Sequence, residues 1–243
     1  MVSILHTCYT LYMSDEHIYN EESMLERLMY NRPSNEWFLN NLPSNPIILD
    51  IGACDGLDSI NFSRLFPSGK IFAFEPFTKI TKKFKDYGVP SNVTLNEYAI
   101  SNTDGVHEFW ESSGVTEDGK WEFSGSGSLL EPLEHLIHYP EVKFENVVQV
   151  ETKRLDTWLK ENNLSHIDFI WMDVQGAEHM VFEGASEILN KIKYIYTEIG
   201  HHELYKGQVN FDSLLEYLPG FKIVELFEGD VLLINESFHS IRQ

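Results

Sequence analysis

The chain has 243 residues, of which 42% are hydrophobic and 23% are charged, as is usual for a folded globular protein and not for extended disorder. This length suits one α/β domain with a single sizeable core. Lys and Arg number 18 against 38 Asp and Glu, which gives a formal net charge of −20. Because such a charge repels phosphate backbones, we predict no nucleic-acid partner.

No stretch of the sequence approaches the roughly 18 consecutive apolar residues that span a bilayer. The N-terminal residues also lack a basic region ahead of an apolar one, so we expect neither a membrane span nor a signal peptide. The two cysteines, Cys8 and Cys54, are too few for a disulfide framework. These features favour a cytoplasmic protein.

The first 45 residues are predicted to form a helical extension. Within residues 21–30, four apolar residues stand at helical spacing: Met24, Leu25, Leu28 and Met29. We expect this extension to cover one side of the domain or to cap a substrate pocket. The main domain is then expected over residues 46–243.

Strands and helices alternate through most of that domain. Strands are predicted at residues 46–51, 70–74, 93–100, 168–172 and 194–199, and helices at residues 58–66, 80–88, 155–162, 177–189 and 211–218. Residues 105–150 interrupt the alternation and are predicted to be an insertion, with strands at 106–110 and 147–150 and a helix over 129–138. The C-terminal residues form a hairpin around Glu228-Gly229-Asp230. The pattern predicts an α/β fold with a mostly parallel sheet and helices on both faces.

A loop with the sequence DIGACDG, residues 50–56, joins the first strand to the first helix. Glycines there allow a ligand to approach the backbone, and a helix N-terminus offers free N–H groups. Glu75 ends the second strand, where an acidic residue about 20 positions after such a loop accepts hydrogen bonds from ribose hydroxyls. Loop and carboxylate together predict a site for a nucleoside-containing cofactor.

The charge of this loop indicates which cofactor. A dinucleotide-binding loop has the pattern G-x-G-x-x-G, but Cys54 stands at the second glycine. Acidic residues at Asp50, Asp55 and Asp58 would repel a pyrophosphate and attract a cationic sulfonium. The sequence therefore favours S-adenosylmethionine over NAD.

Two more carboxylates end later strands at the same sheet edge, where open α/β sheets bind ligands. Asp173 follows the fourth parallel strand, and Glu198, followed by His201 and His202, ends the next. Together with His179 they could act as acid and base or bind a divalent metal. The alternatives are a helix N-cap for Asp173 and a loop anchor for Glu198.

A pair of histidines, His135 and His138, stands three residues apart on the predicted helix of the insertion. We identify no nearby cysteine or acidic partner at ligand spacing for this pair, so we predict no metal site there.

These motifs resemble the FkbM-type methyltransferases, a branch of the class I S-adenosylmethionine-dependent enzymes. The resemblance covers residues 47–234 and rests on several ordered motifs: residues 50–56 with Ser59, Phe74-Glu75-Pro76, Ala99-Ile100, Leu155-Asp156, residues 173–178, Gly184-Ala185, and Glu198 with Leu204-Tyr205. It implies a Rossmann-like, seven-stranded sheet whose last strand is antiparallel. It also implies methyl transfer to a hydroxyl, often of a sugar or a polyketide-type natural product.

The resemblance also implies roles for individual residues. Asp50, Gly52 and Gly56 would line the amino-acid end of the cofactor, within a loop that also contains Ala53, Cys54 and Ser59. Glu75 would hold the ribose, and the region of Ala99 would border the adenine. Asp173 and Glu178 belong to the most characteristic motif of the family.

The sequence departs from the family pattern at several positions: Cys54, Asp55, Gln175 and His179. Because Gln175 stands where Glu is common, one potential metal ligand is lost, and a divalent metal is not favoured. We predict Asp173 or His179 as the base, with Glu198 and His201 or His202 orienting a sugar or small-molecule acceptor. An NAD-dependent oxidoreductase and a non-catalytic scaffold are the alternatives.

Overall fold

The computed structural model describes residues 10–11, 32–115, 121–200 and 202–238. The helix predicted within residues 21–30 and the candidate residue His201 lie outside the described residues. Of the N-terminal extension, the structure describes the short strand β1 (Thr10–Leu11) and the helix α2 (Asn35–Asn41).

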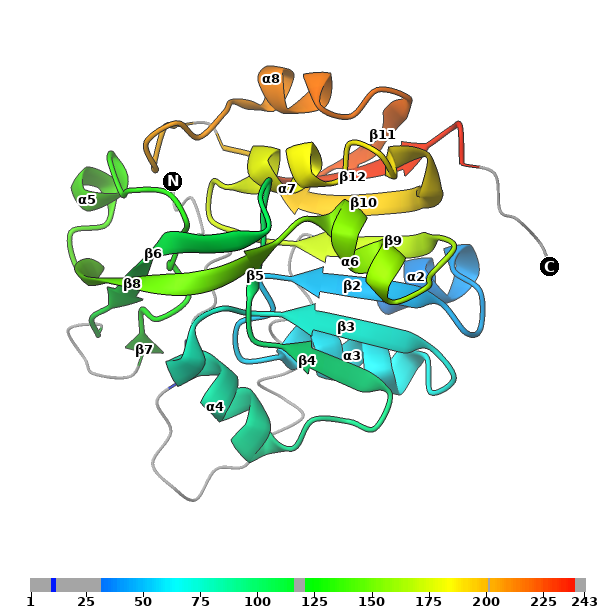
Figure 1. Cartoon of the computed structure of the whole chain (residues 1–243), viewed down its shortest axis with the longest axis horizontal. Coiled ribbons are helices and arrows are strands. Elements are labelled where there is room, and N and C mark those ends of the chain that lie inside the picture. Colours follow the sequence, from blue (N-terminus) through cyan, green and yellow to red (C-terminus); the bar gives the residue numbers. More distant parts are fainter. Residues whose placement is uncertain (1–9, 12–31, 116–120, 201, 239–243) are drawn as a thin grey trace.

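A seven-stranded sheet forms the centre of the protein (Figure 1). Its strand order is β11-β12-β10-β9-β2-β3-β4. The bounds are β2 (Ile47–Ile51), β3 (Lys70–Phe74), β4 (Val93–Asn96), β9 (Ile167–Met172), β10 (Ile192–Glu198), β11 (Phe221–Leu226) and β12 (Asp230–Asn235). β12 runs antiparallel to β10 and β11, and the other neighbours are parallel. The predicted α/β class, the antiparallel last strand and the C-terminal hairpin are confirmed.

Helices cover both faces of this sheet, because its central strands are apolar on both sides. In β9, Phe169 and Trp171 belong to the apolar cluster beneath α2 and α3 (Leu57–Leu65). The alternate residues Ile170 and Met172 face the opposite cluster, which contains side chains from α6 (Leu155–Glu161), α7 (Glu178–Gly184) and α8 (Phe211–Glu216). Figure 1 shows α6 in front of the sheet and α2 and α3 behind it. The helix α4 (Thr78–Tyr87) follows β3.

Strands from the predicted insertion, residues 105–150, belong to a second sheet of three strands. Its order is β5-β8-β6, with bounds β5 (Ala99–Ile100), β6 (Gly105–Ser113) and β8 (Lys143–Lys153). β7 (Trp121–Glu122) pairs with β1, and the short helix α5 (His135–His138) follows. Figure 1 shows β6 and β8 beyond the end of the main sheet to which the arrowheads of β2 and β3 point. The insertion therefore lies at the edge predicted to carry the site.

Three predicted elements differ from those observed. The strand expected at residues 93–100 is two strands, because β4 leaves β3 after Asn96 and β5 pairs instead with β8. The helix expected over 129–138 is only α5, since residues 131–134 bond to a distant segment, residues 203–206. The helix expected over 177–189 ends at Gly184, which lies so close to the Ser101 carbonyl that a Cβ would stand 2.0 Å from it.

Candidate active site

The loop after β2 is shaped by backbone contacts that need glycine. Gly52 has φ +84°, and a Cβ there would stand 1.8 Å from the carbonyl oxygen of Asp173. The amides of Gly52 and Ala53 donate to the Phe74 carbonyl, at 2.9 and 3.0 Å. Gly56 has φ +80° and packs on Phe84. The loop is therefore bound on one side to β3 and pressed on the other against the end of β9.

We expect Gly52→Ala to lower the free energy of unfolding by at least about 3 kcal/mol, because it adds a backbone clash to left-handed strain of about 1–2 kcal/mol. Urea denaturation measures this loss. Gly229→Ala is the matched control, since Gly229 has φ +94° and open space around it, so that variant reports the strain alone. Equal losses in the two variants would contradict close contact between the loop and Asp173.

A cavity lies between this loop, the end of β3 and the insertion. The empty space there is about 590 Å³, a volume that includes open solvent. The residues that line it come from every segment at this edge: Ile51, Gly52, Cys54, Phe74, Glu75, Pro76, Phe77, Ile80, Ala99, Ile100, Phe109, Ser124, Gly125, Gly127, Ser128, Leu129, Asp173, Val174 and Gln175. The fold thus brings together residues that are more than 120 positions apart in the sequence.

The predicted site residues fall into two layers. The first lines the cavity and consists of Gly52, Cys54, Glu75, Ala99 and Asp173. The second does not line the cavity and consists of Asp50, Ala53 and Gly56 in the loop itself and Ser59 on α3. Within this layer the Ser59 hydroxyl donates to an Asp50 carboxylate oxygen at 2.6 Å, so Asp50 supports the start of α3 from inside.

Glu75 joins the loop to the cavity wall. One carboxylate oxygen accepts from the Cys54 amide at 3.0 Å, and the other accepts from the Phe77 amide at 2.8 Å. Burial is the main cause that raises the pKa of Glu75 to about 7, against the lowering effect of these two bonds. Each carboxylate oxygen has a second lone pair, so Glu75 can hold the loop and accept from a ligand at once.

A chain of polar contacts positions Asp173. The Gln175 side-chain amide donates to an Asp173 carboxylate oxygen at 2.6 Å. The Tyr205 hydroxyl lies 3.1 Å from Gln175 Oε1 and 2.7 Å from the carbonyl oxygen of Ser126. Gln175 is held in the left-handed region, with φ +56°. The sequence predicts no such role for Gln175 or Tyr205, and their place in the family motifs is the one signal that it contains for them.

Two further carboxyl groups, those of Glu178 and Glu198, lie near Asp173. Glu178 accepts from the amides of Val174 and Gly176, and burial raises its pKa to about 7. Burial and the nearby charges of Asp173 and Glu178 raise the pKa of Glu198 well above its usual range. Neither Glu178 nor Glu198 lines the cavity. Each of them lies close enough to Asp173 for the charge of Asp173 to raise its pKa further.

The predicted base His179 is placed differently from Asp173. It lies on α7 with its ring 6.2 Å from that of Tyr217, and it is not among the residues that line the cavity. Burial lowers the pKa of His179. Among the described residues its Nδ1 has no hydrogen-bond partner. Of the two candidate bases, only Asp173 faces the cavity.

The two histidines considered as a chelating pair, His135 and His138, have different surroundings. His135 is fully buried among the rings of Tyr139, Phe144 and Tyr205, and burial lowers its pKa to about 4. His138 is largely exposed. The two rings therefore do not form the chelating pair considered in the sequence.

The buried carboxylates predict a stability that falls as pH rises. The pKa of Asp50 is raised from 3.8 to about 8, mainly by burial and then by the charge of Asp58, and the pKa values of Glu75 and Glu178 are raised from 4.5 to about 7. Between pH 4 and pH 8 the folded state thus binds more protons than the unfolded chain, so the free energy of unfolding decreases through this interval.

Urea denaturation at several pH values from 5 to 8 measures this decrease. Asp50→Asn should flatten the curve by up to about 1.4 kcal/mol per pH unit, the value for one proton. The exposed Asp212 provides the control, since Asp212→Asn should leave the slope unchanged. A wild-type stability that rises from pH 5 to pH 8 would contradict the raised pKa values.

The fold and the site together define a class of protein. A seven-stranded sheet with an antiparallel last strand, a glycine loop after β2 and a carboxylate after β3 are the features of class I methyltransferases. The family model described as "Methyltransferase FkbM domain" matches residues 50–224. The chain belongs to the FkbM methyltransferase family, and this family implies S-adenosylmethionine as the methyl donor.

Two relatives identified by sequence, NoeI and sdnD, agree with this membership. The chain is 42% identical over 196 residues to the 2-O-methyltransferase NoeI of Sinorhizobium fredii, covering 79% of this chain and 80% of that protein. It is 32% identical over 170 residues to the methyltransferase sdnD of Sordaria araneosa, covering 60% and 63%. The FkbM methyltransferase structure from Methylobacillus flagellatus is 12% identical, with a TM-score of 0.46 over 82% of this chain and 50% of that one.

No helix in the described part of the chain is both long enough and apolar enough to cross a membrane.

Proposed function

We propose that this protein transfers a methyl group from S-adenosylmethionine to a hydroxyl oxygen of a sugar or a small natural product. The observation that carries the proposal is that Asp173 faces the same cavity as Gly52 and Glu75. A candidate base and a candidate cofactor site thus share one space. The 42% identity to a protein named as a 2-O-methyltransferase supports oxygen as the atom that receives the methyl group.

The cavity has the chemistry that the methyl donor requires. Glu75 offers carboxylate oxygens to ribose hydroxyls, and Ala99 with Ile100 forms a small apolar border for the adenine. Phe77 and Phe109 add apolar walls. The carboxyl groups of Glu75 and Asp173 in the lining suit a cationic ligand and oppose the pyrophosphate of NAD. These residues fit S-adenosylmethionine.

When bound, S-adenosylmethionine supplies a methyl group on a cationic sulfur, which makes that carbon electrophilic. A hydroxyl is a weak nucleophile at neutral pH, so a base must take its proton. We assign this proton to an Asp173 carboxylate oxygen. Gln175 and Tyr205 hold that carboxylate in one orientation, and such alignment contributes orders of magnitude to rate.

The acceptor is proposed to enter beside the insertion. Residues 124–125 and 127–129 line the cavity opposite the loop after β2. Ser128 donates to the carbonyl oxygen of Gln175 at 2.8 Å, which ties the insertion to the loop that carries Asp173. Substrate choice therefore depends on this wall, in line with the general location of specificity in loops.

Two parts of the sequence-based prediction are kept as proposals: that a divalent metal is not favoured in this cavity, and that the protein is cytoplasmic. The amide of Gln175 is engaged by both Asp173 and Tyr205, so we do not assign it to a divalent metal, and proton removal is assigned to Asp173 instead. The cytoplasmic location stays a prediction. We favour neither an oxidoreductase nor a scaffold, because Asp173 lines the same cavity as the candidate cofactor residues Glu75 and Ala99.

Two measurements on the purified protein test the proposal. Isothermal titration should show about one equivalent of S-adenosylhomocysteine bound and no binding of NADH. Transfer of a labelled methyl group should then be detected with a panel of sugars and small molecules that carry free hydroxyls, and not with their O-methylated counterparts. Binding of NADH alone would favour the oxidoreductase, and cofactor binding without transfer to any acceptor would favour the scaffold.

A further inference from the structure

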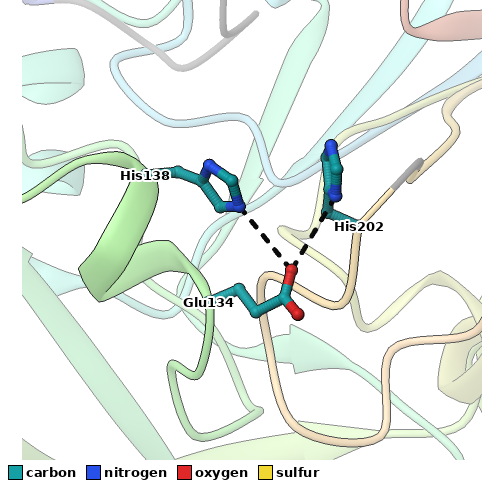
Figure 2. Close-up of side chains that lie close together, drawn as sticks. All are labelled: Glu134, His138 and His202. Atoms are coloured by element: carbon teal, nitrogen blue, oxygen red, sulfur yellow. Dashed lines mark ion pairs between the residues drawn. The ribbon is translucent and has the colours of Figure 1, made fainter.

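Three side chains converge on the surface between the insertion and the loop after β10. Glu134 and His138 stand four residues apart, at the N-terminus and the end of α5, and therefore face the same side. His202 comes from the loop after β10. Figure 2 shows the three groups pointing toward one another, with the Glu134 carboxylate below the two rings and an ion pair drawn to each.

The distances within this cluster leave room for an ion. Glu134 Oε2 lies 3.6 Å from His138 Nε2 and 3.8 Å from His202 Nδ1, which is too long for a hydrogen bond. All three candidate ligand atoms lie within 4.8 Å of one another. Ligand atoms around a tetrahedral Zn²⁺ with bonds of about 2.0–2.1 Å are roughly 3.3–3.4 Å apart. Because these side chains are substantially exposed, a small rotamer adjustment closes the difference.

Backbone hydrogen bonds next to the cluster join two segments, residues 131–135 and residues 203–206. The amides of Leu133 and His135 both donate to the carbonyl oxygen of Leu204, at 2.8 and 3.1 Å. The amide of Lys206 donates to the carbonyl oxygen of Glu131 at 2.8 Å. These bonds fix the positions of α5 and of the segment around residue 204, so the ligands start from a preorganised arrangement.

We propose that Glu134, His138 and His202 bind a divalent transition-metal ion of the Zn²⁺ type, with water completing the coordination. Two imidazoles and one carboxylate are a ligand set that Zn²⁺ accepts, and their nitrogen content disfavours Mg²⁺ and Ca²⁺. None of the three residues lines the cavity that contains Asp173. The ion therefore joins the insertion to the loop after β10. That loop contains Tyr205, whose hydroxyl contacts the side chain of Gln175.

The positions of these residues explain why the sequence alone does not predict the cluster. The pair His135 and His138 has the spacing of a chelate, but His135 is buried. Glu134 replaces it on the exposed face, and His202 is brought from 64 positions further along the chain.

Titration of the full chain with Zn²⁺ tests the proposal, with Co²⁺ as a spectroscopic probe. We expect one equivalent of Zn²⁺ to bind and the Co²⁺ form to show the visible absorption of a tetrahedral site. His138→Ala and His202→Ala should each weaken binding at least tenfold. His166→Ala is the matched control, because His166 also faces a carboxylate, Asp168, at 3.4 Å but without a second histidine; it should bind as the wild type does.

Hydrogen exchange gives a second measurement that is independent of methyl transfer. Zn²⁺ should slow exchange of the amides of Leu133, His135 and Lys206 in the wild type and not in His202→Ala. Binding that neither substitution weakens, binding that His166→Ala weakens equally, or the absence of a one-equivalent site would each overturn the proposal. None of these results depends on the identity of the methyl acceptor.

Discussion

Glu75→Ala is expected to weaken binding of S-adenosylhomocysteine by about 100-fold or more. Hydrogen bonds to a charged group contribute about 1.5–3 kcal/mol each, and Glu75 is assigned two from the ribose, so about 3 kcal/mol or more is lost, which corresponds to at least two orders of magnitude in Kd. The substitution also removes the acceptors of the Cys54 and Phe77 amides. Isothermal titration measures the loss.

The control for this prediction separates ligand binding from stability. Glu97 is an exposed carboxylate just after β4 that interacts with Lys85 and Thr81 and does not line the cavity. Glu97→Ala should bind S-adenosylhomocysteine as tightly as the wild type. Circular dichroism establishes that Glu75→Ala is folded at the temperature of the titration, and Glu75→Gln, which retains one acceptor oxygen, provides a milder variant. If folded forms of both variants bind with wild-type affinity, the ribose assignment is wrong.

Asp173→Asn is expected to lower kcat by about 10²–10⁴-fold, the usual contribution of a positioned general base. The substitution keeps the shape of the side chain, and the asparagine oxygen can still accept from the Gln175 amide. Binding of S-adenosylhomocysteine should therefore change by less than about threefold, or about 0.7 kcal/mol. Methyl-transfer rates with an accepted substrate and isothermal titration test the two parts separately.

Two further variants identify the base. His179→Gln should retain most of the activity, because His179 does not line the cavity. Asp86→Asn changes an exposed carboxylate on α4 and should have no effect. A large loss of activity in His179→Gln together with normal activity in Asp173→Asn would transfer the role to the histidine and contradict our assignment.

Much of the fold could be predicted from local pattern. The continuous apolar run of β2, the loop of residues 50–56 and the hairpin at the C-terminus are predictable because each is a short segment whose hydrophobicity and turn residues carry the information. Cofactor chemistry followed from the same segments. A buried parallel strand needs no distant partner to be recognised, and a carboxylate after such a strand lies at the ligand-binding edge by topology alone.

The split between β4 and β5 and the contacts among Gln175, Tyr205 and Ser126 depended on tertiary structure. These are pairings between residues that are far apart in sequence, and local propensity does not encode which distant partner satisfies a strand edge or a hydroxyl. The exposed cluster of Glu134, His138 and His202 has the same origin. The sequence by itself determined most of the elements, the sheet edge and the class of cofactor, whereas packing of the insertion against that edge decided which side chains share a cavity and which share the surface.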